Sequence, residues 1–178
     1  MPKYKVLIAG AGIGGLSAAL CLMKAGHQVE IYEQAPMLAE IGAGIQISAN
    51  AMHVLRDLGL ERPIVEVGVS PDAYVFRLHD SGEVIQRFSL SEEHKRLHGA
   101  PYTQLHRADL HDILAARGRS FDSGVVRLNH KVVGFEESEA DVNLRFDNGA
   151  TAKGDLLIGA DGLKSVVARQ IVAIKQNS

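Results

Sequence analysis

Short apolar runs alternate with a helical pattern at the start of the chain. Residues 5–9 (KVLIA) are mainly apolar and end at glycines, which is typical of a buried parallel strand. Residues 14–25 have helical spacing, and Gly26 stands where helices commonly end. Residues 28–33 (QVEIYE) read as a second strand. This order of strand, turn, helix and strand predicts the βαβ unit that opens a doubly wound α/β sheet.

A hairpin pattern interrupts the middle of the chain. Asp80-Ser81-Gly82 separates two segments, residues 73–79 and 83–88, which predict a β-hairpin. Before it, residues 40–48 predict a glycine-containing loop, and Asn50 is expected to cap the helix that follows. The remaining predicted elements are a helix over 107–117, strands over 125–128, 131–136, 142–146 and 155–159, and a turn at 147–149.

A glycine-rich turn joins the first strand to the first helix. Gly10 permits a tight turn, Gly12 lets the backbone approach a pyrophosphate, and Gly15 lets the helix pack close to the strand. The helix N-terminus offers free N–H groups to phosphate oxygens. Glu33 closes the second strand 18 residues after Gly15, and its carboxylate can accept hydrogen bonds from ribose hydroxyls. The pattern predicts a dinucleotide site and leaves FAD and NAD both open.

Composition and charge narrow the class of protein. The 178 residues carry a formal net charge of -2 without a basic block, so nothing predicts a nucleic acid or an acidic membrane as partner. Glycines interrupt the apolar run that begins at Tyr4, which argues against a membrane span there. The single cysteine, Cys21, allows no intrachain disulfide, and its place in a predicted helix suggests a small core residue. We expect a cytoplasmic protein.

One histidine pair has the spacing of a metal site. His94 and His98 stand at positions i and i+4, but the surrounding segment is charged and supplies no clear third ligand. The segment therefore predicts a solvated helix, and no metal site is expected.

Three further segments resemble one flavoprotein family. They are residues 42–50 (GAGIQISAN), 105–110 (LHRADL) and 155–162 (DLLIGADG). With GAGIGG and the Glu33-Gln34 pair, they resemble the FAD-dependent aromatic-ring monooxygenases, the group of salicylate hydroxylase and 6-hydroxynicotinate 3-monooxygenase. The resemblance covers residues 3 to about 167 and implies a Rossmann-like FAD-binding sheet with an inserted β-hairpin segment.

The resemblance also implies a domain organisation. The FAD-binding domain is expected over residues 1–168 in two pieces, about 1–70 and 100–168, while residues 71–99 begin the sheet of a substrate domain. Residues 169–178 are expected to be a tail. The family's third FAD motif, a Gly-Asp pair that meets the ribityl chain, is expected beyond the end of this chain, so the chain is expected to be the N-terminal part of a C-terminally truncated protein.

By this resemblance the cofactor is FAD, with NADH or NADPH as co-substrate. The pyrophosphate would lie at Gly14 and the neighbouring glycines 10, 12 and 15, and the adenosine ribose at Glu33 and Gln34. Gln46 would pass the flavin ring, and Arg107 would reach phosphate and ribityl oxygens.

Two further contacts follow from the resemblance. Val132 would contact the adenine through its main chain, and Asp161-Gly162 would meet both FAD and the passing nicotinamide. Each position also has a structural interpretation. Arg107 could form a surface ion pair at its helix start, Gln46 could be a solvated loop residue, Val132 a simple strand residue and Asp161 a turn former.

The sequence departs from the family at two positions. Some relatives carry a catalytic histidine where Gln46 stands, and because glutamine cannot act as a base, Gln46 is only a weak catalytic candidate. No other catalytic residue can be named. The second dinucleotide motif usually reads Asp-Gly-x-x-Ser-x-x-Arg. Here Ser165 is present, but Ala168 takes the place of the arginine, which comes one residue later at Arg169.

Together these patterns predict a flavin-dependent monooxygenase that hydroxylates a phenolic or hydroxypyridine-type aromatic acid with NAD(P)H and O₂. The expected partners are the small aromatic substrate and O₂, and the full-length form could be a homodimer. Two alternatives stay open: a non-catalytic dinucleotide-binding fragment and a simple NAD-linked oxidoreductase. Cofactor identity separates the last from the others, and turnover separates the first two.

Overall fold

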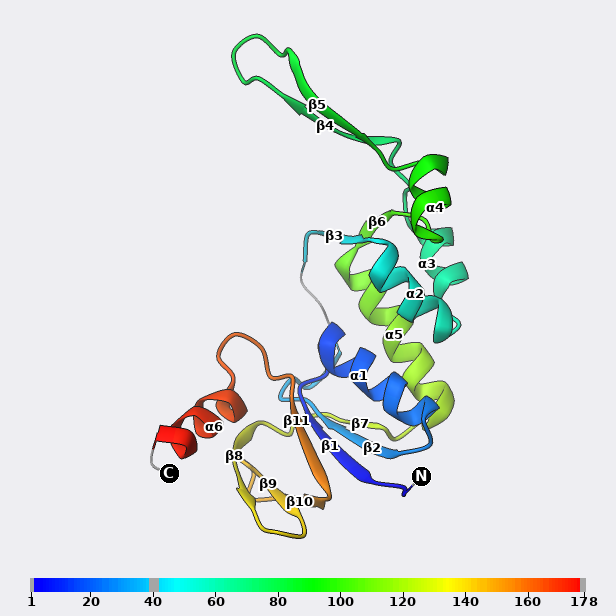
Figure 1. The fold of residues 1–178 in the computed structure, drawn as a ribbon. Coiled ribbons are helices and arrows are strands. Elements are labelled where there is room, and N and C mark those ends of the chain that lie inside the picture. Colours follow the sequence, from blue (N-terminus) through cyan, green and yellow to red (C-terminus); the bar gives the residue numbers. More distant parts are fainter. Residues whose placement is uncertain (1, 39–41, 177–178) are drawn as a thin grey trace. The chain divides into compact units, whose positions relative to one another are not determined.

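The computed structural model describes residues 2–38 and 42–176 (Figure 1). The chain divides into two compact units. The first unit contains residues 1–40 and 114–178, and the second contains residues 41–113. The predicted domain boundaries near residues 70 and 100 concern cofactor and substrate domains, and they stay a prediction.

A parallel sheet forms the centre of the first unit. Val6 lies opposite Val29 on one side and opposite Leu156 on the other, so three strands run in register. The strand between these two neighbours, residues 5–9, is buried at four of its five residues, as its apolar sequence predicts. The α/β class and the parallel sheet are confirmed. In the order in which they pair, the strands are β11 (Leu156–Gly159), β1 (Lys5–Ala9), β2 (Gln28–Tyr32) and β7 (Val126–Arg127).

Helix α1 (Ile13–Lys24) follows β1 and packs against the sheet through Leu16, Ala19 and Leu20. Successive helical residues are rotated by about 100°. Cys21 is therefore turned away from this buried stripe, and its side chain is exposed. The prediction that Cys21 is a core residue was wrong.

An antiparallel sheet of three strands completes the first unit. It consists of β8 (Val132–Glu137), β9 (Val142–Phe146) and β10 (Thr151–Gly154), in the order β10-β9-β8. Gly149 has a φ of 80° in the predicted turn between β9 and β10. The two sheets share one hydrophobic core, in which Leu7 and Tyr32 meet Leu144 and Phe146.

Helix α6 (Val166–Gln176) packs against β8 and includes residues that the sequence set apart as a tail. The side-chain amide of Gln170 accepts a hydrogen bond from the Phe135 N–H at 3.0 Å and donates one to the Phe135 carbonyl at 2.6 Å. This amide therefore satisfies the outer backbone groups of an edge strand.

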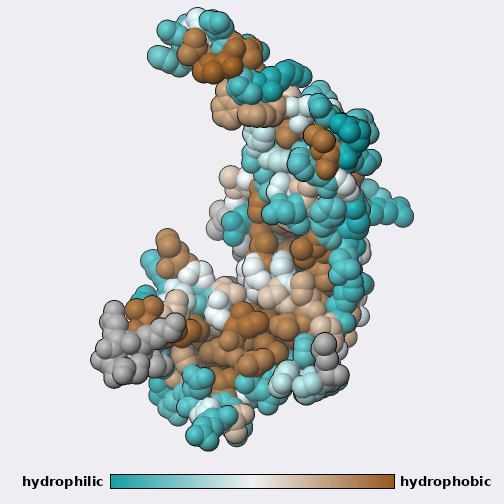
Figure 2. All heavy atoms as spheres, viewed as in Figure 1, coloured by the Kyte–Doolittle hydropathy of each residue, from teal (hydrophilic) through white to brown (hydrophobic). Residues whose placement is uncertain are grey.

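The second unit combines two small strand pairs with helices. Strands β3 (Gly44–Ile47) and β6 (Thr103–His106) pair antiparallel, and β4 (Ala73–Arg77) and β5 (Val84–Ser89) form the predicted hairpin. Figure 2 shows hydrophobic side chains on this hairpin, where Phe76 and Phe88 are half exposed. The helices are α2 (Ala49–Asp57), α3 (Glu61–Val67), α4 (Glu92–His98) and α5 (Arg107–Phe121), whose residues from 114 onward belong to the first unit.

Two local expectations differ from the structure. The segment predicted as a loop over residues 40–48 contains β3, because its apolar positions pair with β6, a partner distant in sequence; residues 40 and 41 lie outside the described part. Ser48, not Asn50, precedes α2 as its N-cap, and Asn50 lies inside the first turn. Among the described residues, no helix is long and apolar enough to cross a membrane.

Candidate dinucleotide site

The glycine-rich turn brings three chain segments together at the end of the parallel sheet. Gly10 has a φ of 100°, and its N–H donates a hydrogen bond to the Tyr32 carbonyl at 2.8 Å. A Cβ on Gly10 would lie 2.4 Å from the Ala160 carbonyl oxygen, closer than any real contact. Only glycine fits both the left-handed backbone and this approach to the end of β11.

Gly15 and Gly14 differ in their surroundings although they are neighbours. A Cβ on Gly15 would lie 2.0 Å from the Gly10 carbonyl oxygen, so Gly15 is required for the close start of α1. A Cβ on Gly14 would meet no atom within 4 Å. Packing therefore explains Gly15 and leaves space beside Gly14.

The N-terminus of α1 has the chemistry of a phosphate site. Gly12 is its N-cap and supplies no side-chain hydrogen bond, and the first turn contains no acidic residue. The first N–H groups of a helix need acceptors and carry a partial positive charge. With the space at Gly14, this end of the helix fits a pyrophosphate.

Glu33 is held beside this turn by backbone donors. Its Oε2 accepts a hydrogen bond from the Ala11 N–H and its Oε1 accepts one from the Ala35 N–H, each at 2.9 Å. Glu33 is half-buried. Because a carboxylate offers about four lone-pair positions, two stay available for ribose hydroxyls. The next residue, Gln34, is exposed.

A charged network supports β2 next to the site. Glu30 accepts a hydrogen bond from the Tyr32 hydroxyl at 2.6 Å and pairs with Lys5 at 3.1 Å. Burial acts to raise the pKa of Glu30, but these two partners, with Arg127, hold it below its usual range. Burial and the hydrogen bond to Glu30 raise the pKa of Tyr32. The network stabilises β2, and Glu33 follows the last residue of this strand.

Asp161 has a structural task in α6. One carboxylate oxygen accepts a hydrogen bond from the Ser165 hydroxyl at 2.5 Å, and the other accepts from the N–H groups of Val166 and Val167 at 2.7 and 3.2 Å. This arrangement caps the helix N-terminus. Gly162, with a φ of 76°, allows the sharp turn between β11 and α6. The predicted cofactor contact of this pair stays a prediction.

Val132 lies in β8 opposite Phe146, and its side chain is buried in the shared core. Any contact with adenine must therefore come from its main chain, as the resemblance implied. The loop before β8 lies beside Glu33, because the His130 N–H donates to the Glu33 carbonyl at 2.9 Å. Asn129 in this loop has a φ of 57°.

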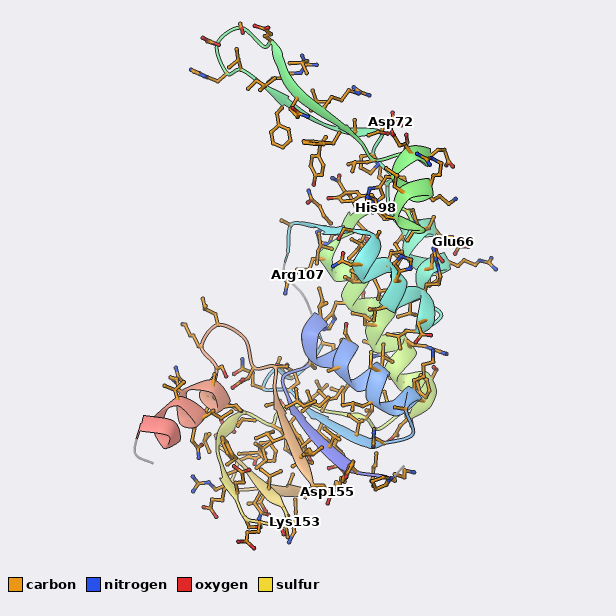
Figure 3. The ribbon with its side chains drawn as sticks, in the orientation of Figure 1. Glu66, Asp72, His98, Arg107, Lys153 and Asp155 are labelled. Atoms are coloured by element: carbon orange, nitrogen blue, oxygen red, sulfur yellow. The ribbon has the colours of Figure 1, made fainter. Side chains whose placement is uncertain are left out.

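Gln46 and Arg107 belong to the second unit, whereas all the other candidate residues belong to the first. Gln46 is exposed on β3 and lies opposite Gln104 of β6. Arg107, labelled in Figure 3 at the start of α5, is also exposed. A Cβ on Gly42 would lie 2.9 Å from the Cβ and Cδ atoms of Arg107. Glycine at position 42 therefore allows the chain to pass close to the aliphatic part of the Arg107 side chain.

The sequence did not predict the backbone groups that contact Glu33 and Gly10. The N–H groups of Ala11 and Ala35 hold Glu33, and the carbonyl of Ala160 lies against Gly10. Backbone groups of alanine carry no sequence signal. For the close approach of Gly42 to Arg107, the only signal in the sequence was the presence of a glycine.

The two histidines of α4 that have the spacing of a metal site contact each other and an aromatic ring. The rings of His94 and His98 contact each other at 4.6 Å, and His94 also meets the edge of Tyr102. The predicted solvated helix is confirmed, since α4 contains no buried residue, although His94 is half-buried. The described residues contain no group of three metal ligands.

Comparison with known proteins identifies the family. A model of the FAD binding domain matches residues 3–177. The chain belongs to this FAD-binding family. The predicted cofactor, FAD, is thereby confirmed at the level of the family, and a simple NAD-type fold is not favoured.

The relatives of this FAD-binding chain are aromatic-ring enzymes. It is 39% identical over 168 residues to the 3-amino-4-hydroxybenzoate 2-monooxygenase of Streptomyces cremeus, covering 94% of the chain and 42% of that protein. It is 32% identical over 163 residues to the 6-hydroxynicotinate 3-monooxygenase of Bordetella bronchiseptica, covering 92% and 42%. The chain thus spans less than half the length of the curated relatives it matches. The resemblance to aromatic-ring monooxygenases is confirmed.

A solved structure agrees with the fold. A variant of HpxO from Klebsiella pneumoniae in complex with FAD has 32% sequence identity and a TM-score of 0.78, covering 92% of this chain and 41% of that one. The fold of this chain is therefore similar to that of a protein whose structure contains bound FAD.

Proposed function

We propose that the chain is the FAD-binding part of a flavin-dependent monooxygenase that hydroxylates a phenolic or hydroxypyridine-type aromatic acid with NAD(P)H and O₂. The observation that carries the proposal is the placement of Glu33. Its carboxylate is fixed 2.9 Å from the Ala11 N–H, beside the uncapped end of α1. A ribose and a pyrophosphate would thus meet adjacent groups of the first unit.

The remaining site assignments are part of the proposal. The pyrophosphate would lie at the glycine-rich turn, the ribose at Glu33 and Gln34, and the adenine at the main chain of Val132. Arg107 would reach phosphate and ribityl oxygens, Gln46 would pass the flavin ring, and Asp161-Gly162 would meet both FAD and the passing nicotinamide. The bound flavin would supply electron transfer from NADH or NADPH to O₂, and this chain would bind and orient it.

The names of the relatives support the substrate class. They act, by name, on aminohydroxybenzoate and hydroxynicotinate, which are aromatic rings bearing a carboxylate and an electron-donating hydroxyl. No acid–base role is assigned to Gln46, because an amide does not exchange protons in the required range.

The second candidate is a module that binds the dinucleotide without turnover. The coverage of only 42% of each relative favours it for the chain by itself. We therefore expect the 178-residue chain to bind FAD weakly or not at all and to hydroxylate nothing. The half-exposed Leu156 of β11 and the fully exposed Leu163 favour self-association.

A chimera tests the proposal directly. Residues 3–167 would replace the matching segment of the Streptomyces cremeus relative, so that the relative supplies the rest of its own length. We expect a yellow protein that releases FAD on denaturation and oxidises NADH or NADPH with hydroxylation of an aromatic acid, detected by mass. A folded chimera that binds NAD tightly but cannot be loaded with FAD would contradict the proposal.

The isolated chain supplies the complementary measurement. FAD would be titrated into the 178-residue chain while flavin fluorescence is followed, and NAD(P)H oxidation would be tested with hydroxybenzoates and hydroxynicotinate. A hydroxylated product would exclude the non-catalytic module. FAD binding without product would support it for this chain alone.

A further inference from the structure

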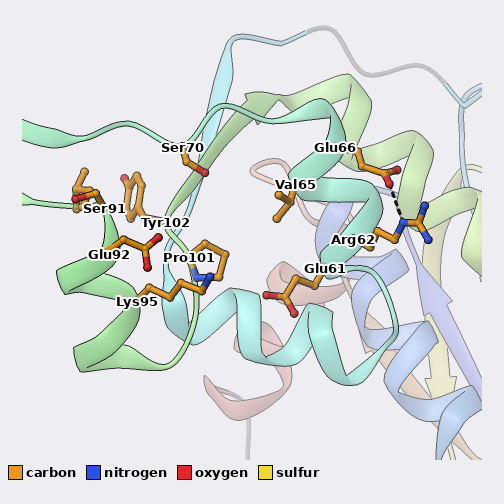
Figure 4. A pocket seen from close by; sticks show the side chains of 11 residues that line it. Glu61, Arg62, Val65, Glu66, Ser70, Ser91, Glu92, Lys95, Pro101 and Tyr102 are labelled. Carbon is orange, nitrogen blue, oxygen red and sulfur yellow. Dashed lines mark hydrogen bonds and ion pairs between the residues drawn. The ribbon is translucent and has the colours of Figure 1, made fainter.

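A pocket of about 450 Å³ in the second unit, between α3 and α4, has a lining whose charges compensate one another (Figure 4). Arg56 of α2 donates hydrogen bonds to Glu61 of α3, at 2.5 and 2.8 Å, and to the Gly99 carbonyl at the end of α4, at 2.9 Å. Arg62 donates to Glu66 at 2.7 Å, and α4 adds one cation and one anion. These charges therefore select no class of ligand.

His130, in the loop between β7 and β8, differs from these paired groups because one of its ring nitrogens stays accessible. Its Nδ1 lies 2.6 Å from the carbonyl oxygen of Leu128. A carbonyl can only accept, so Nδ1 carries the proton, and Nε2 of the neutral ring is an acceptor. Nε2 makes no hydrogen bond with the described residues and is not enclosed by them. The ring therefore presents one acceptor at the surface.

Two aromatic rings and one hydrogen bond fix the orientation of this imidazole. Its centroid lies 5.6 Å from that of Tyr32 and 4.9 Å from that of Phe146, which it meets edge to face at 89°. Tyr32 and Phe146 are both buried, whereas His130 is half-buried. Because the ring is held before any ligand arrives, binding at Nε2 costs little side-chain entropy.

The loop that carries His130 is bonded to the segment proposed to hold the ribose. The His130 N–H donates to the Glu33 carbonyl at 2.9 Å, and the Asn129 N–H donates to the Ala35 carbonyl at 3.1 Å. From the turn between β9 and β10, the Asn148 amide donates to the Asn129 carbonyl at 3.2 Å. These bonds hold Asn129 at its φ of 57°, which asparagine tolerates. The imidazole and the Glu33 carboxylate are thus both held at the end of β2.

We propose that His130 recognises the adenine of the cofactor, with its Nε2 accepting a hydrogen bond from the 6-amino group. This role rests on the proposed function, because FAD supplies the adenine. The base is attached to the ribose proposed at Glu33, and its other proposed contact, the main chain of Val132, lies two residues after His130. An acceptor here favours a base with a donor at position 6 and disfavours one without it. His130 is thus a residue that determines specificity for the base.

Two nucleotides separate recognition of the base from simple packing of the ring. They are ADP and purine riboside 5′-diphosphate, which lacks only the 6-amino group. Both would be titrated into the 178-residue chain and followed by backbone amide shifts in two-dimensional NMR. Because ADP has no flavin, its binding needs neither Gln46 nor Arg107. We expect both nucleotides to shift signals around Glu33 and His130, and ADP to bind about three- to tenfold more tightly through its one extra hydrogen bond.

His130→Phe keeps an aromatic ring between Tyr32 and Phe146 but removes the acceptor. ADP and the purine analogue should bind this variant with equal affinity, because only ADP loses a contact. If the ring served packing alone, both nucleotides would weaken together and their affinity ratio would stay unchanged. His79→Phe is the matched control, since this exposed histidine lies in the turn between β4 and β5 and should leave the ratio unaltered.

The ring nitrogens allow a measurement that needs no variant. Nitrogen NMR of the histidine rings in the unchanged chain should show a protonated Nδ1 and an unprotonated Nε2 at His130. The Nε2 signal should shift when ADP is added and much less when the purine analogue is added. A protonated Nε2 in the neutral ring would contradict the assignment of the acceptor.

Three binding results would overturn the proposal: no binding of either nucleotide, equal affinity for both in the unchanged chain, and an unchanged affinity ratio in folded His130→Phe. The chimera keeps these results distinct from the proposed function. A preference for ADP in the chain, with a chimera that cannot be loaded with FAD, would refute the proposed function and retain the adenine contact. A chimera that holds FAD, with a chain that shows no preference for ADP, would refute the role of His130 alone.

Discussion

The carboxylate of Glu33 accepts a hydrogen bond of 2.9 Å from the backbone N–H of Ala11, so the end of β2 is joined directly to the glycine-rich turn after β1. The bond crosses 22 positions of sequence. It places an anionic acceptor for ribose hydroxyls beside the donors proposed for the pyrophosphate.

Glu33→Ala should weaken FAD binding about ten- to a hundredfold, because hydrogen bonds to a charged group contribute about 1.5–3 kcal/mol. Flavin fluorescence titration checks this, in the chimera if the isolated chain binds too weakly. The exposed Glu139→Ala is the control. Equal FAD affinity of the Glu33 variant and the unchanged protein would remove Glu33 from the site.

The neighbouring glycines of the turn should respond differently to one added methyl group. Gly15→Ala should lower the free energy of unfolding by about 1–3 kcal/mol, because its Cβ would overlap the Gly10 carbonyl. Gly14→Ala meets no atom, so it should raise that free energy by up to about 1 kcal/mol through helix propensity. Urea unfolding measures both.

The same pair separates folding from binding. If the pyrophosphate lies at Gly14, the added methyl group should weaken FAD binding even though the fold is stabilised. A Gly14→Ala protein with improved stability and unchanged FAD affinity would place the phosphates elsewhere.

Asp161→Ala should destabilise the first unit by about 1–2 kcal/mol, because α6 loses its cap. Asp161→Ser keeps a capping oxygen and should restore most of this stability. FAD titration of the serine variant then isolates the proposed cofactor contact. Normal affinity in that variant would assign Asp161 to helix capping alone.

Glu30 should make stability depend on acid pH. Its folded pKa is lowered, so the unfolded chain takes up the proton first as pH falls. This contribution is complete above the ordinary glutamate value of about 4.3, and it is lost as pH falls through the lowered folded pKa. Unfolding measured from pH 7 downward should show a flatter acid limb for Glu30→Gln.

Tyr32→Phe provides the matched comparison for Glu30. It removes the hydrogen bond of 2.6 Å but keeps the ring that packs on Phe146 at 4.6 Å. The pKa of Glu30 should then move toward its ordinary value, which NMR titration of the carboxylate can follow. An unchanged titration would exclude Tyr32 as a cause.

Local sequence patterns predicted the elements whose determinants lie close together in the chain. The apolar run at 5–9, the glycines from Gly10 to Gly15 and the turn before Gly149 each appear in the structure as expected. Strand β3 was missed because its partner β6 lies about 60 residues away, and pairing at that distance leaves only weak alternation in the sequence. Cys21 was misplaced because the apolar helix gave no clear polar face.

The sequence by itself determined the family motifs, the parallel βαβ unit and the residue types that suit FAD. Tertiary structure decided which groups those residues meet. Glu33 is held by the N–H groups of Ala11 and Ala35, and Asp161 by the N-terminus of α6. Arg56 connects α2, α3 and the end of α4, which no motif in the sequence predicted. Glycine and acidic positions are selected locally by backbone geometry and charge, whereas backbone partners and cavities exist only after distant segments have packed.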